Sequence, residues 1–261
     1  MRGLPRYVSP DTLSPTPDMQ KPSIVPATGK TAEVEAMFDE IAPRYDLLNR
    51  VLSFGTDVWW RKRAVAWLGE GLGAHRPDRL LDVATGTADL AAEALSLGPR
   101  EVVGVDISDG MLAVGRVKMA RRGLDRRVTL IQGDAADLPF EDAAFDGALV
   151  AFGVRNFENL EAGLTGIRRV LRPGAPLVVL EFSQPTAFPV KQGYAFYSKH
   201  VLPRIGAAVS GSSEAYEYLP ESVAAFPAGE AFLRVFRSAG FRDAEARPLT
   251  FGVVSLYRGR A

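Results

Sequence analysis

The chain has no cysteine and only two histidines, His75 and His200, among its 261 residues. Without cysteine there is no disulfide, no zinc–thiolate site and no thiol nucleophile, and two histidines offer few ligands to a transition metal. Long apolar runs are also missing. No stretch approaches the roughly 18 residues that a membrane-spanning helix needs, and the N-terminus lacks a secretory pattern. We expect a cytoplasmic protein without a metal site, for which peripheral membrane contact through an amphipathic surface stays open.

A net charge of either sign is missing as well, because 31 basic residues balance 31 acidic ones. Nucleic acid is therefore not an expected partner. The length fits one α/β domain with additions. Residues 1–30 hold six of the 18 prolines and few bulky apolar residues, so we expect a mobile tail with no assigned role.

The remaining chain, residues 31–261, has the pattern of a single doubly wound α/β domain. Apolar positions at steps of three and four predict a helix from residue 31 to about Pro43, and a second helix is expected over 59–68. These two form an N-terminal helical cap (31–70). Beyond it, strand-length apolar runs alternate with helical segments, which predicts a parallel sheet covered on both faces. The expected strands are 79–84, 101–106, 128–133, 145–152 and 175–182, and the helices lie near 87–97, 108–122 and 158–171.

The C-terminal third departs from this alternation. Residues 185–228 form an irregular or helical insert rich in aromatic side chains. We interpret this insert as a lid over a substrate, or as an apolar surface facing a membrane. A helix over 229–239 and two strands, 241–249 and 250–259, then complete a seven-stranded, mostly parallel sheet with a C-terminal antiparallel hairpin.

Acidic and small residues stand at the ends of the first three strands, where open α/β sheets bind ligands. Asp82 leads into a loop with one glycine, Gly86, and Asp106 follows twenty positions later. That spacing is typical of an acid that accepts hydrogen bonds from both hydroxyls of an adenosine ribose. Asp134 is placed to accept from the amine of adenine, while Ala135 supplies a backbone N–H. The alternative is that Asp82 and Asp106 only cap the helices that follow them.

The loop after the first strand has few glycines, which narrows the choice of adenosine ligand. A dinucleotide site would use the full G-x-G-x-x-G pattern for its pyrophosphate. This loop has a single glycine, Gly86, and an acid follows the third strand as well. The combination favours S-adenosylmethionine, which carries a carboxylate and an amine in place of phosphates.

Several longer motifs resemble those of the menaquinone and ubiquinone C-methyltransferases. "RYDLLN", "FGVRN" and "YSKHVLPRIG" are far more specific than the general methyltransferase loop "LLDVATGTADL", and the resemblance covers about residues 31–260. It implies a class I, Rossmann-like, S-adenosylmethionine-dependent enzyme that methylates a ring carbon of a polyprenyl quinol. The substrate would be demethylmenaquinol or a ubiquinol precursor, and a homodimer is one expected assembly. The implied cofactor contacts are Thr87, Asp106, Asp134, Ala135 and Ala151.

Two departures from the family pattern affect this assignment. In the loop, Thr85 stands where the family usually has glycine or cysteine, and Ala88 stands where it has glycine. At the end of the fourth strand, Ala151 stands where serine is frequent. A methyl group at position 88 repositions the methionine carboxylate, which weakens the assignment of Thr87. Two other functions remain as alternatives: methylation of another phenolic or lipid acceptor, and a non-catalytic module that binds an adenosine ligand.

The end of the fourth strand carries the candidate catalytic pair Arg155 and Asn156. We expect this strand beside the first, so that both side chains face the methyl group. Methylating a quinol carbon requires loss of a phenolic proton, and Arg155 would stabilise the phenolate or hold the water that takes the proton. Asn156 would fix the second quinol oxygen. The alternatives are an ion pair of Arg155 with Glu158 or Glu181, and a helix cap at Asn156.

Two further residues are catalytic candidates on chemical grounds. Tyr45, in "PRYDLLN" on the cap, would complete a water site by hydrogen bonding. His200 is a candidate base, because histidine has an ordinary pKa near neutrality. The alternative for both is a structural role, as for the Trp59–Trp60 pair, which is expected to pack in the cap or to line an opening for an isoprenoid tail.

Overall fold

The computed structural model describes residues 29–201 and 214–261. Residues 1–28, almost all of the expected mobile tail, lie outside the described residues. The described chain folds around one sheet with strand order β3-β2-β1-β4-β5-β7-β6. The strands are β1 Arg79–Val83, β2 Glu101–Asp106, β3 Val128–Gln132, β4 Gly147–Ala151, β5 Pro176–Phe182, β6 Arg242–Leu249 and β7 Val254–Arg260.

The pairing confirms the predicted doubly wound sheet. Strands β1 to β5 are parallel, and β7 inserts antiparallel between β5 and β6. Strand β4 lies beside β1, as expected from the sequence. The order reverses between β1 and β4, so the carboxyl ends of these two strands flank the place where open α/β sheets bind ligands.

Helices cover both faces of the sheet, which explains the continuous apolar strands. One face packs against α3 (Thr56–Leu72), α4 (Asp89–Ala94) and α5 (Asp109–Arg121). The other packs against α6 (Leu160–Val170) and α10 (Glu230–Ser238). Each face has its own cluster of buried side chains, so alternate residues of a strand enter different cores.

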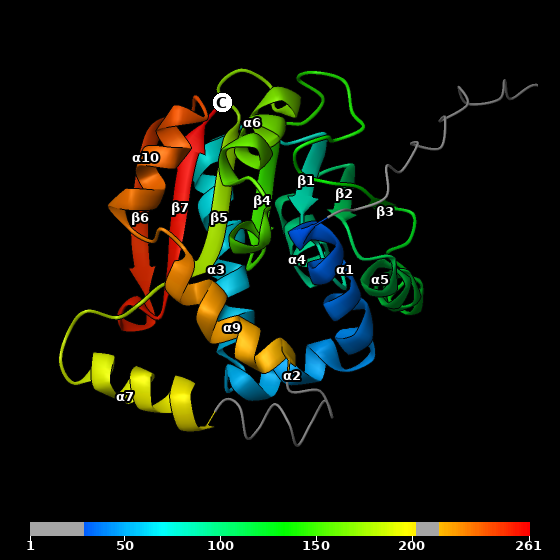
Figure 1. Cartoon of the computed structure of the whole chain (residues 1–261). Helices are drawn as coiled ribbons and strands as arrows, with labels where there is room; N and C mark the ends of the chain where they lie inside the picture. The colour runs from blue at the N-terminus through cyan, green and yellow to red at the C-terminus, as the bar shows by residue number, and fades with distance from the viewer. Residues whose placement is uncertain (1–28, 202–213) are drawn as a thin grey trace, which may run out of the picture.

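Additional helices gather beyond the carboxyl ends of β1 to β5, at the lower end of the molecule in Figure 1. They are α1 (Lys30–Ile41), α2 (Tyr45–Leu52), α7 (Val190–Phe196) and α9 (Glu214–Ala225), with a π-helical turn over Tyr197–Val201. The sequence predicted a cap helix ending near Pro43 and a second over 59–68, which corresponds to α3, and missed α2 between them. Pro43 lies in a 3-10 turn (Ala42–Arg44), after which the helix restarts at Tyr45. In the described part of the chain, no helix has both the length and the apolar character to cross a bilayer.

Candidate active site

A first cavity lies at the carboxyl ends of β1 to β4, under the N-terminal cap. Five of the residues expected to contact the cofactor line it, and Thr31, Val34, Phe38 and Tyr45 reach it from the cap. The five are Gly86, Asp106, Asp134, Ala135 and Ala151. The sequence therefore placed most of these residues together, because each lies at the end of a parallel strand or within three residues after it. Asp82 and Thr87 do not line this cavity.

Asp106 organises the floor of the first cavity. It is 9% exposed. Its Oδ2 accepts a hydrogen bond from the Gly86 N–H (2.7 Å) and its Oδ1 accepts one from the Ser108 N–H (3.0 Å). Burial raises the pKa of Asp106 to about 6, against the effect of these backbone donors. Asp106 does not cap α5, since the Ser108 hydroxyl accepts from the Met111 N–H (3.0 Å) at that position. Carboxylate oxygens accept more than one bond each, so capacity remains for ribose hydroxyls.

The loop after β1 bends sharply between the strand and α4. Ala84, Gly86 and Ala88 all have positive φ, at 54°, 54° and 68°. Left-handed backbone costs a residue with a Cβ roughly 1–2 kcal/mol, which is why glycine suits such positions. The family's usual glycine at position 88 is thus explained by backbone conformation. In this chain Ala88 adopts that conformation as the residue that precedes α4.

Asp82 lies beneath this loop and is fully buried. Its Oδ2 accepts a hydrogen bond from the Thr85 hydroxyl (2.6 Å). Burial raises the pKa of Asp82 to about 7, and the Thr85 bond opposes that rise. Asp82 therefore supports the loop from below. Thr85, one of the two departures from the family pattern, supplies the hydrogen-bond donor to this buried carboxyl group.

The raised pKa of Asp82 makes the stability of the fold dependent on pH. Because the folded carboxyl group holds its proton to about pH 7 and the unfolded one only to about pH 4, stability falls as pH rises between these values. Asparagine at this position does not titrate and retains an acceptor for Thr85. We expect the free energy of unfolding of Asp82→Asn, relative to the parent, to rise by about 2 kcal/mol between pH 5 and pH 8. Urea unfolding at both pH values measures this difference, and a difference independent of pH would contradict it.

Thr87 points away from the first cavity into a charged cluster under the cap. Its hydroxyl donates to Asp46 Oδ1 (2.5 Å) and accepts from Lys118 Nζ (2.8 Å). Lys118 Nζ also pairs with Asp46 Oδ2 (2.5 Å) and with Asp89 Oδ1 (2.9 Å). We call these four residues the Lys118 cluster. It joins α2 of the cap to the start of α4 and to α5. Its members come from three separate parts of the chain, so no local sequence pattern indicates it.

The space enclosed in the first cavity is about 70 Å³. Asp39 of α1 adds a second attachment of the cap: its Oδ1 accepts from the Ser108 hydroxyl (2.5 Å) and from the Gly110 N–H (3.0 Å). The cap is therefore attached to the body by side-chain hydrogen bonds at two separate places.

Lys118→Met should loosen the cap over this cavity. The substitution removes the shared donor of Asp46, Thr87 and Asp89, and partly buried pairs of this kind contribute about 1–2 kcal/mol. We expect a fall of a few degrees in the midpoint of thermal unfolding and a three- to tenfold rise in KM for S-adenosylmethionine.

The control is Arg116→Met on the same helix. Arg116 pairs with Asp109 at 3.0 Å, and both side chains are largely exposed, so little should change. Equal effects of the two substitutions would show that the Lys118 cluster does not act on the cofactor cavity.

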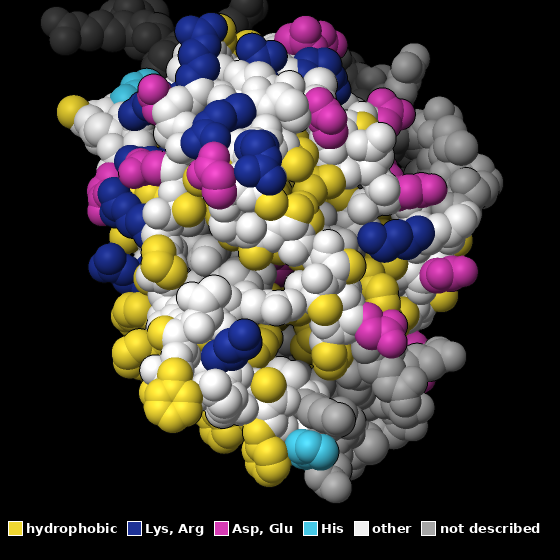
Figure 2. All heavy atoms as spheres, turned by 60° about the vertical axis from the view of Figure 1, so that its left-hand side comes forward, with side chains coloured by type: hydrophobic (Ala, Val, Ile, Leu, Met, Phe, Trp, Pro, Cys, Tyr) yellow, Lys and Arg dark blue, Asp and Glu magenta, His cyan; other side chains and the backbone are white. Residues whose placement is uncertain are grey.

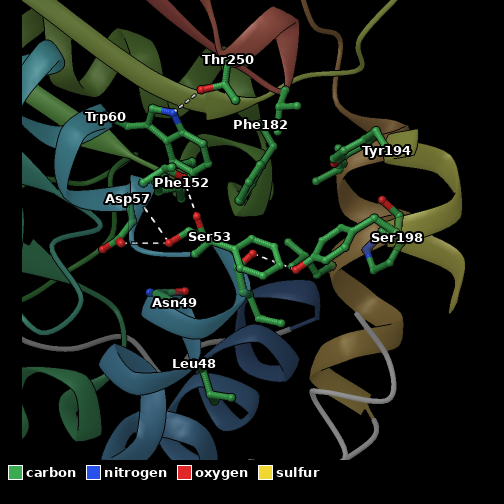
Figure 3. Close-up of a pocket in the computed structure, with 18 of the residues that line it drawn as sticks. Leu48, Asn49, Ser53, Asp57, Trp60, Phe152, Phe182, Tyr194, Ser198 and Thr250 are labelled. Atoms are coloured by element: carbon green, nitrogen blue, oxygen red, sulfur yellow. Dashed lines mark hydrogen bonds between the residues drawn. The ribbon is translucent and has the colours of Figure 1, made fainter. Parts of the chain in front are cut away.

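A second, apolar cavity of about 470 Å³ adjoins the first. The two share Phe38, Tyr45 and Phe152 in their walls. In Figure 3, Phe182 lies between Trp60 and Phe152 on one side and Tyr194 of the insert on the other. Trp60 is buried and donates its Nε1–H to Thr250 Oγ1 (2.7 Å), whereas Trp59 is 49% exposed. The second cavity has the size and apolar walls of a small-molecule site.

Arg155 enters the wall of the second cavity from the end of β4. Its side chain is only 7% exposed, and its Nη1 lies 2.9 Å from Glu181 Oε1. It also donates from Nη1 to the Phe152 carbonyl and from Nε to Ser222 Oγ (3.3 Å). Among the described residues, Nη2 has no hydrogen-bond acceptor. The structure thus shows the ion pair that was the alternative reading, and it also keeps the guanidinium at the cavity.

Gly153 lets β4 bring Arg155 this close to the first strand. A Cβ at position 153 would lie 2.3 Å from the Ala84 Cβ, far below van der Waals contact. The next residues form a 3-10 turn, Val154–Asn156. Asn156 lines the first cavity, and its Oδ1 accepts from the Tyr218 hydroxyl (3.0 Å). It does not cap α6, because the Asn159 side chain does so.

Tyr45 and His200, the other two catalytic candidates, have very different positions. Tyr45 lines both cavities, and burial raises the pKa of its hydroxyl. Its ring meets Phe38 edge to face, with centroids 6.1 Å apart. His200 is exposed and lies outside the walls of both cavities, with its ring centroid 5.1 Å from that of Phe196 and the two rings tilted by 48°. Its placement gives the expected role as a base no support.

The residues at the first cavity fit an adenosyl group. Asp106 offers a buried carboxylate at the end of β2, and Asp134 and Ala135 follow β3. Gly86, Ala151 and Gly153 leave room for a ligand against the backbone. Among the described residues there is no group of three or more potential metal ligands.

Comparison with known proteins gives consistent matches over nearly the whole chain. A family model described as the ubiE/COQ5 methyltransferase family matches residues 27–261. A Bacteroides fragilis protein named demethylmenaquinone methyltransferase is 45% identical over 229 residues, which cover 87% of this chain and 92% of the relative. A Deinococcus radiodurans protein of the same name is 47% identical over 240 residues, covering 92% and 97%. A Geobacter sulfurreducens protein named ubiquinone/menaquinone biosynthesis C-methyltransferase UbiE is 45% identical over 234 residues, covering 89% and 90%.

Solved structures share the fold at low sequence identity. The [4+2]-cyclase SpnF superposes with a TM-score of 0.62 at 20% identity, covering 90% of this chain and 98% of that one. A Haemonchus contortus phosphoethanolamine N-methyltransferase 2 in complex with S-adenosyl-L-methionine has a TM-score of 0.54 at 17% identity, covering 82% and 59%. These likenesses support the class I methyltransferase fold, and fold alone does not define the substrate.

Proposed function

This chain belongs to the ubiE/COQ5 methyltransferase family of S-adenosylmethionine-dependent enzymes, and on that premise we propose that it methylates a ring carbon of demethylmenaquinol. The names of its relatives support menaquinol as the product, and one of them adds the ubiquinone pathway. One observation carries the choice of acceptor: an apolar cavity of about 470 Å³ adjoins the cofactor cavity and has a guanidinium in its wall.

The first cavity would hold S-adenosylmethionine through Asp106, Asp134 and the Ala135 N–H, with Gly86 and Ala151 against its backbone-facing side. S-adenosylmethionine supplies an electrophilic methyl group on a sulfonium. The neighbouring apolar cavity would then hold the quinol ring, with Phe38, Tyr45 and Phe152 at the junction. Alignment of the ring carbon with the methyl group is the main requirement of such a transfer.

Arg155 is the group we assign to the phenolic oxygen. Its Nη1 and Nε are held by Glu181, Phe152 and Ser222, so the guanidinium is fixed in orientation before the quinol binds. Its Nη2 remains to stabilise the phenolate that forms when the hydroxyl loses its proton. Glu181 is fully buried, and burial raises its pKa while Arg155 lowers it. Arginine cannot accept the proton, so the proton leaves to a water molecule in the cavity.

Tyr45 and Asn156 complete the acceptor side of the site. Tyr45 lines both cavities, and its hydroxyl, which also hydrogen-bonds with Asn49, would orient that water molecule. Asn156 lines the first cavity and accepts from Tyr218, which leaves its amide N–H groups for a quinol oxygen that reaches the junction of the two cavities. Three parts of the insert line the apolar cavity: α7 through Tyr194, the π-helical turn through Tyr197 and α9 through Leu219. We therefore propose that the insert serves as a lid.

The test is transfer of labelled methyl from S-adenosylmethionine to demethylmenaquinol kept reduced by dithionite. We expect label in the quinol ring and none when the same acceptor is presented as the oxidised quinone, because only the phenolate makes the ring carbon nucleophilic. Label in another phenol but not in the quinol would favour the alternative acceptor. Cofactor binding without any transfer would favour a binding module. Lipid extracts of a deletion strain distinguish the two quinone pathways by the precursor that accumulates.

The long tail of such an acceptor implies a location. A polyprenyl quinol resides in the bilayer, so we propose that the enzyme works in the cytoplasm as a peripheral protein at the inner face of the cell membrane.

A further inference from the structure

Exposed large apolar side chains are concentrated around the apolar cavity. Among the described residues, eight such side chains are exposed, and all but Val117 are within two sequence positions of a residue that lines this cavity. We call these seven the rim. The rim consists of Leu47, Val51, Phe54, Trp59, Phe188, Phe196 and Phe251.

The most exposed members of the rim come from three separate parts of the chain. Phe251 is 82% exposed, Phe188 81%, Phe54 77% and Phe196 62%. Phe54 follows α2, Phe188 and Phe196 flank and end α7, and Phe251 lies in the turn between β6 and β7. In Figure 1 these elements reach the same lower end of the molecule, and in Figure 2 hydrophobic side chains gather along the lower left edge. Single exposed apolar residues are normal, whereas such a gathering marks an interaction surface.

The segments that carry most of the rim also lack acidic residues. The chain has 31 acidic residues among 261, about one in eight, yet none falls in 47–56, 182–201 or 248–253. The charged side chains that the structure describes within these segments are those of Arg50 and Lys191. Segments that combine exposed aromatic side chains with basic residues and contain no acids complement an anionic lipid surface, where each basic residue near the membrane contributes about 1 kcal/mol.

The size of the apolar cavity provides an independent reason for a lipid partner. Its volume of about 470 Å³ accommodates a ring and the first part of a side chain. The rest of a polyprenyl tail has to leave the cavity through an apolar exit. Phe54 both lines this cavity and is largely exposed, and its ring lies 6.0 Å from that of Tyr197, another lining residue. The cavity therefore reaches the surface among the rim residues.

From these observations we propose that the rim docks on an anionic bilayer, with Phe188, Phe196 and Phe251 inserted among the lipids and the apolar cavity facing the membrane. This inference rests on the proposed polyprenyl acceptor. It deepens that proposal, because it gives the enzyme one orientation in which the quinol ring enters directly from the lipid phase while its tail stays in the bilayer.

The test uses the full chain and vesicles that contain no quinol. Phe188→Ser, Phe196→Ser and Phe251→Ser are combined in one variant, since none of the three lines either cavity. Sedimentation with vesicles of phosphatidylcholine and phosphatidylglycerol measures binding. We expect the parent to bind these vesicles, and to bind more weakly to vesicles of pure phosphatidylcholine or in added salt. We expect the triple variant to bind at least about tenfold more weakly than the parent, because binding scales with the apolar area inserted.

Two controls separate docking from folding and from catalysis. Val117→Ser removes an exposed apolar side chain (51% exposed) on α5, away from the rim, and should bind vesicles like the parent. A demethylated quinol with a single isoprene unit, kept in solution, should be methylated equally by the parent and the triple variant. A long-tailed quinol in vesicles should be methylated about tenfold more slowly by the triple variant.

Three results would overturn the inference: no vesicle binding by the parent, equal binding by parent and triple variant, or equal loss in Val117→Ser. A parent that sediments as a dimer, becomes monomeric in the triple variant and ignores vesicles would assign the rim to a second copy of the chain. Failure of the proposed function has a different signature. In that case the parent binds vesicles through the rim but methylates neither the short nor the long quinol.

Discussion

Arg155→Leu is expected to lower turnover about a hundred- to a thousandfold while the affinity for S-adenosylmethionine stays within a few-fold. The loss of one preorganised group that stabilises developing negative charge has this magnitude. Arg155 lines the apolar cavity but not the cofactor cavity, which is why the two effects should separate. The rate of methyl transfer to reduced demethylmenaquinol and calorimetric binding of the cofactor measure them.

The ion pair with Glu181 complicates the single substitution. Glu181 is fully buried, and removing one partner of a buried pair destabilises a protein by about 3–5 kcal/mol. The double variant Arg155→Leu/Glu181→Leu removes both charges and should recover most of that stability. We expect its unfolding midpoint in urea to approach that of the parent while turnover stays as low as in the single variant. Recovered turnover in the double variant would mean that Arg155 acts only by supporting the fold.

Asp106→Ala is expected to weaken S-adenosylmethionine binding about a hundredfold. The substitution removes the acceptor of charge-assisted hydrogen bonds, each of roughly 1.5–3 kcal/mol. It also releases the Gly86 and Ser108 N–H groups that shape the floor of the cavity. Asp134→Ala is the matched comparison, because Asp134 lines the same cavity but is exposed and should cost less. Calorimetry that finds equal losses for the two would remove the special role of Asp106.

The pKa of Asp106 adds a pH dependence to the same experiment. Its folded carboxyl group has a pKa raised to about 6 by burial. Ribose hydroxyls donate to the ionised form, so cofactor affinity should be constant above pH 7 and fall as pH decreases through about 6. Asp106→Asn has no group that titrates there, and its weaker affinity should stay flat between pH 5 and pH 7. A parent affinity that is equally flat would contradict this account.

The sequence by itself determined the order of strands and helices, because each of these elements leaves a pattern in a short stretch of neighbouring residues. Continuous apolar runs of strand length require cover on both faces, and the alternation with helices required a parallel sheet. Residues that follow directly on a strand share its end, so Asp106, Asp134 and Ala151 were placed at one edge without coordinates. The specific motifs likewise identified the family. Cap helix α2 was missed because α1 ends at Ile41 and α2 begins at Tyr45, after only the 3-10 turn that contains Pro43.

The tertiary structure alone decided the direction of individual side chains. In the loop after β1, alternating positive φ values turn Gly86 towards the cavity, while Asp82 lies beneath the loop and Thr87 meets Lys118. A dihedral angle in a tight turn is set by the packing around it, and residue type constrains it only weakly. Contacts between residues far apart in the sequence also depend on this packing.

The Arg155–Glu181 pair shows this most clearly. It exists because β4 lies beside β5, with Ala151 paired to Leu180. Both side chains are buried at that edge, so each charge has the other as its partner in place of water. The sequence supplied an arginine and a glutamate at two strand ends. Only the folded sheet brought them together, because the free energy of burying a charge depends on every neighbour that replaces water.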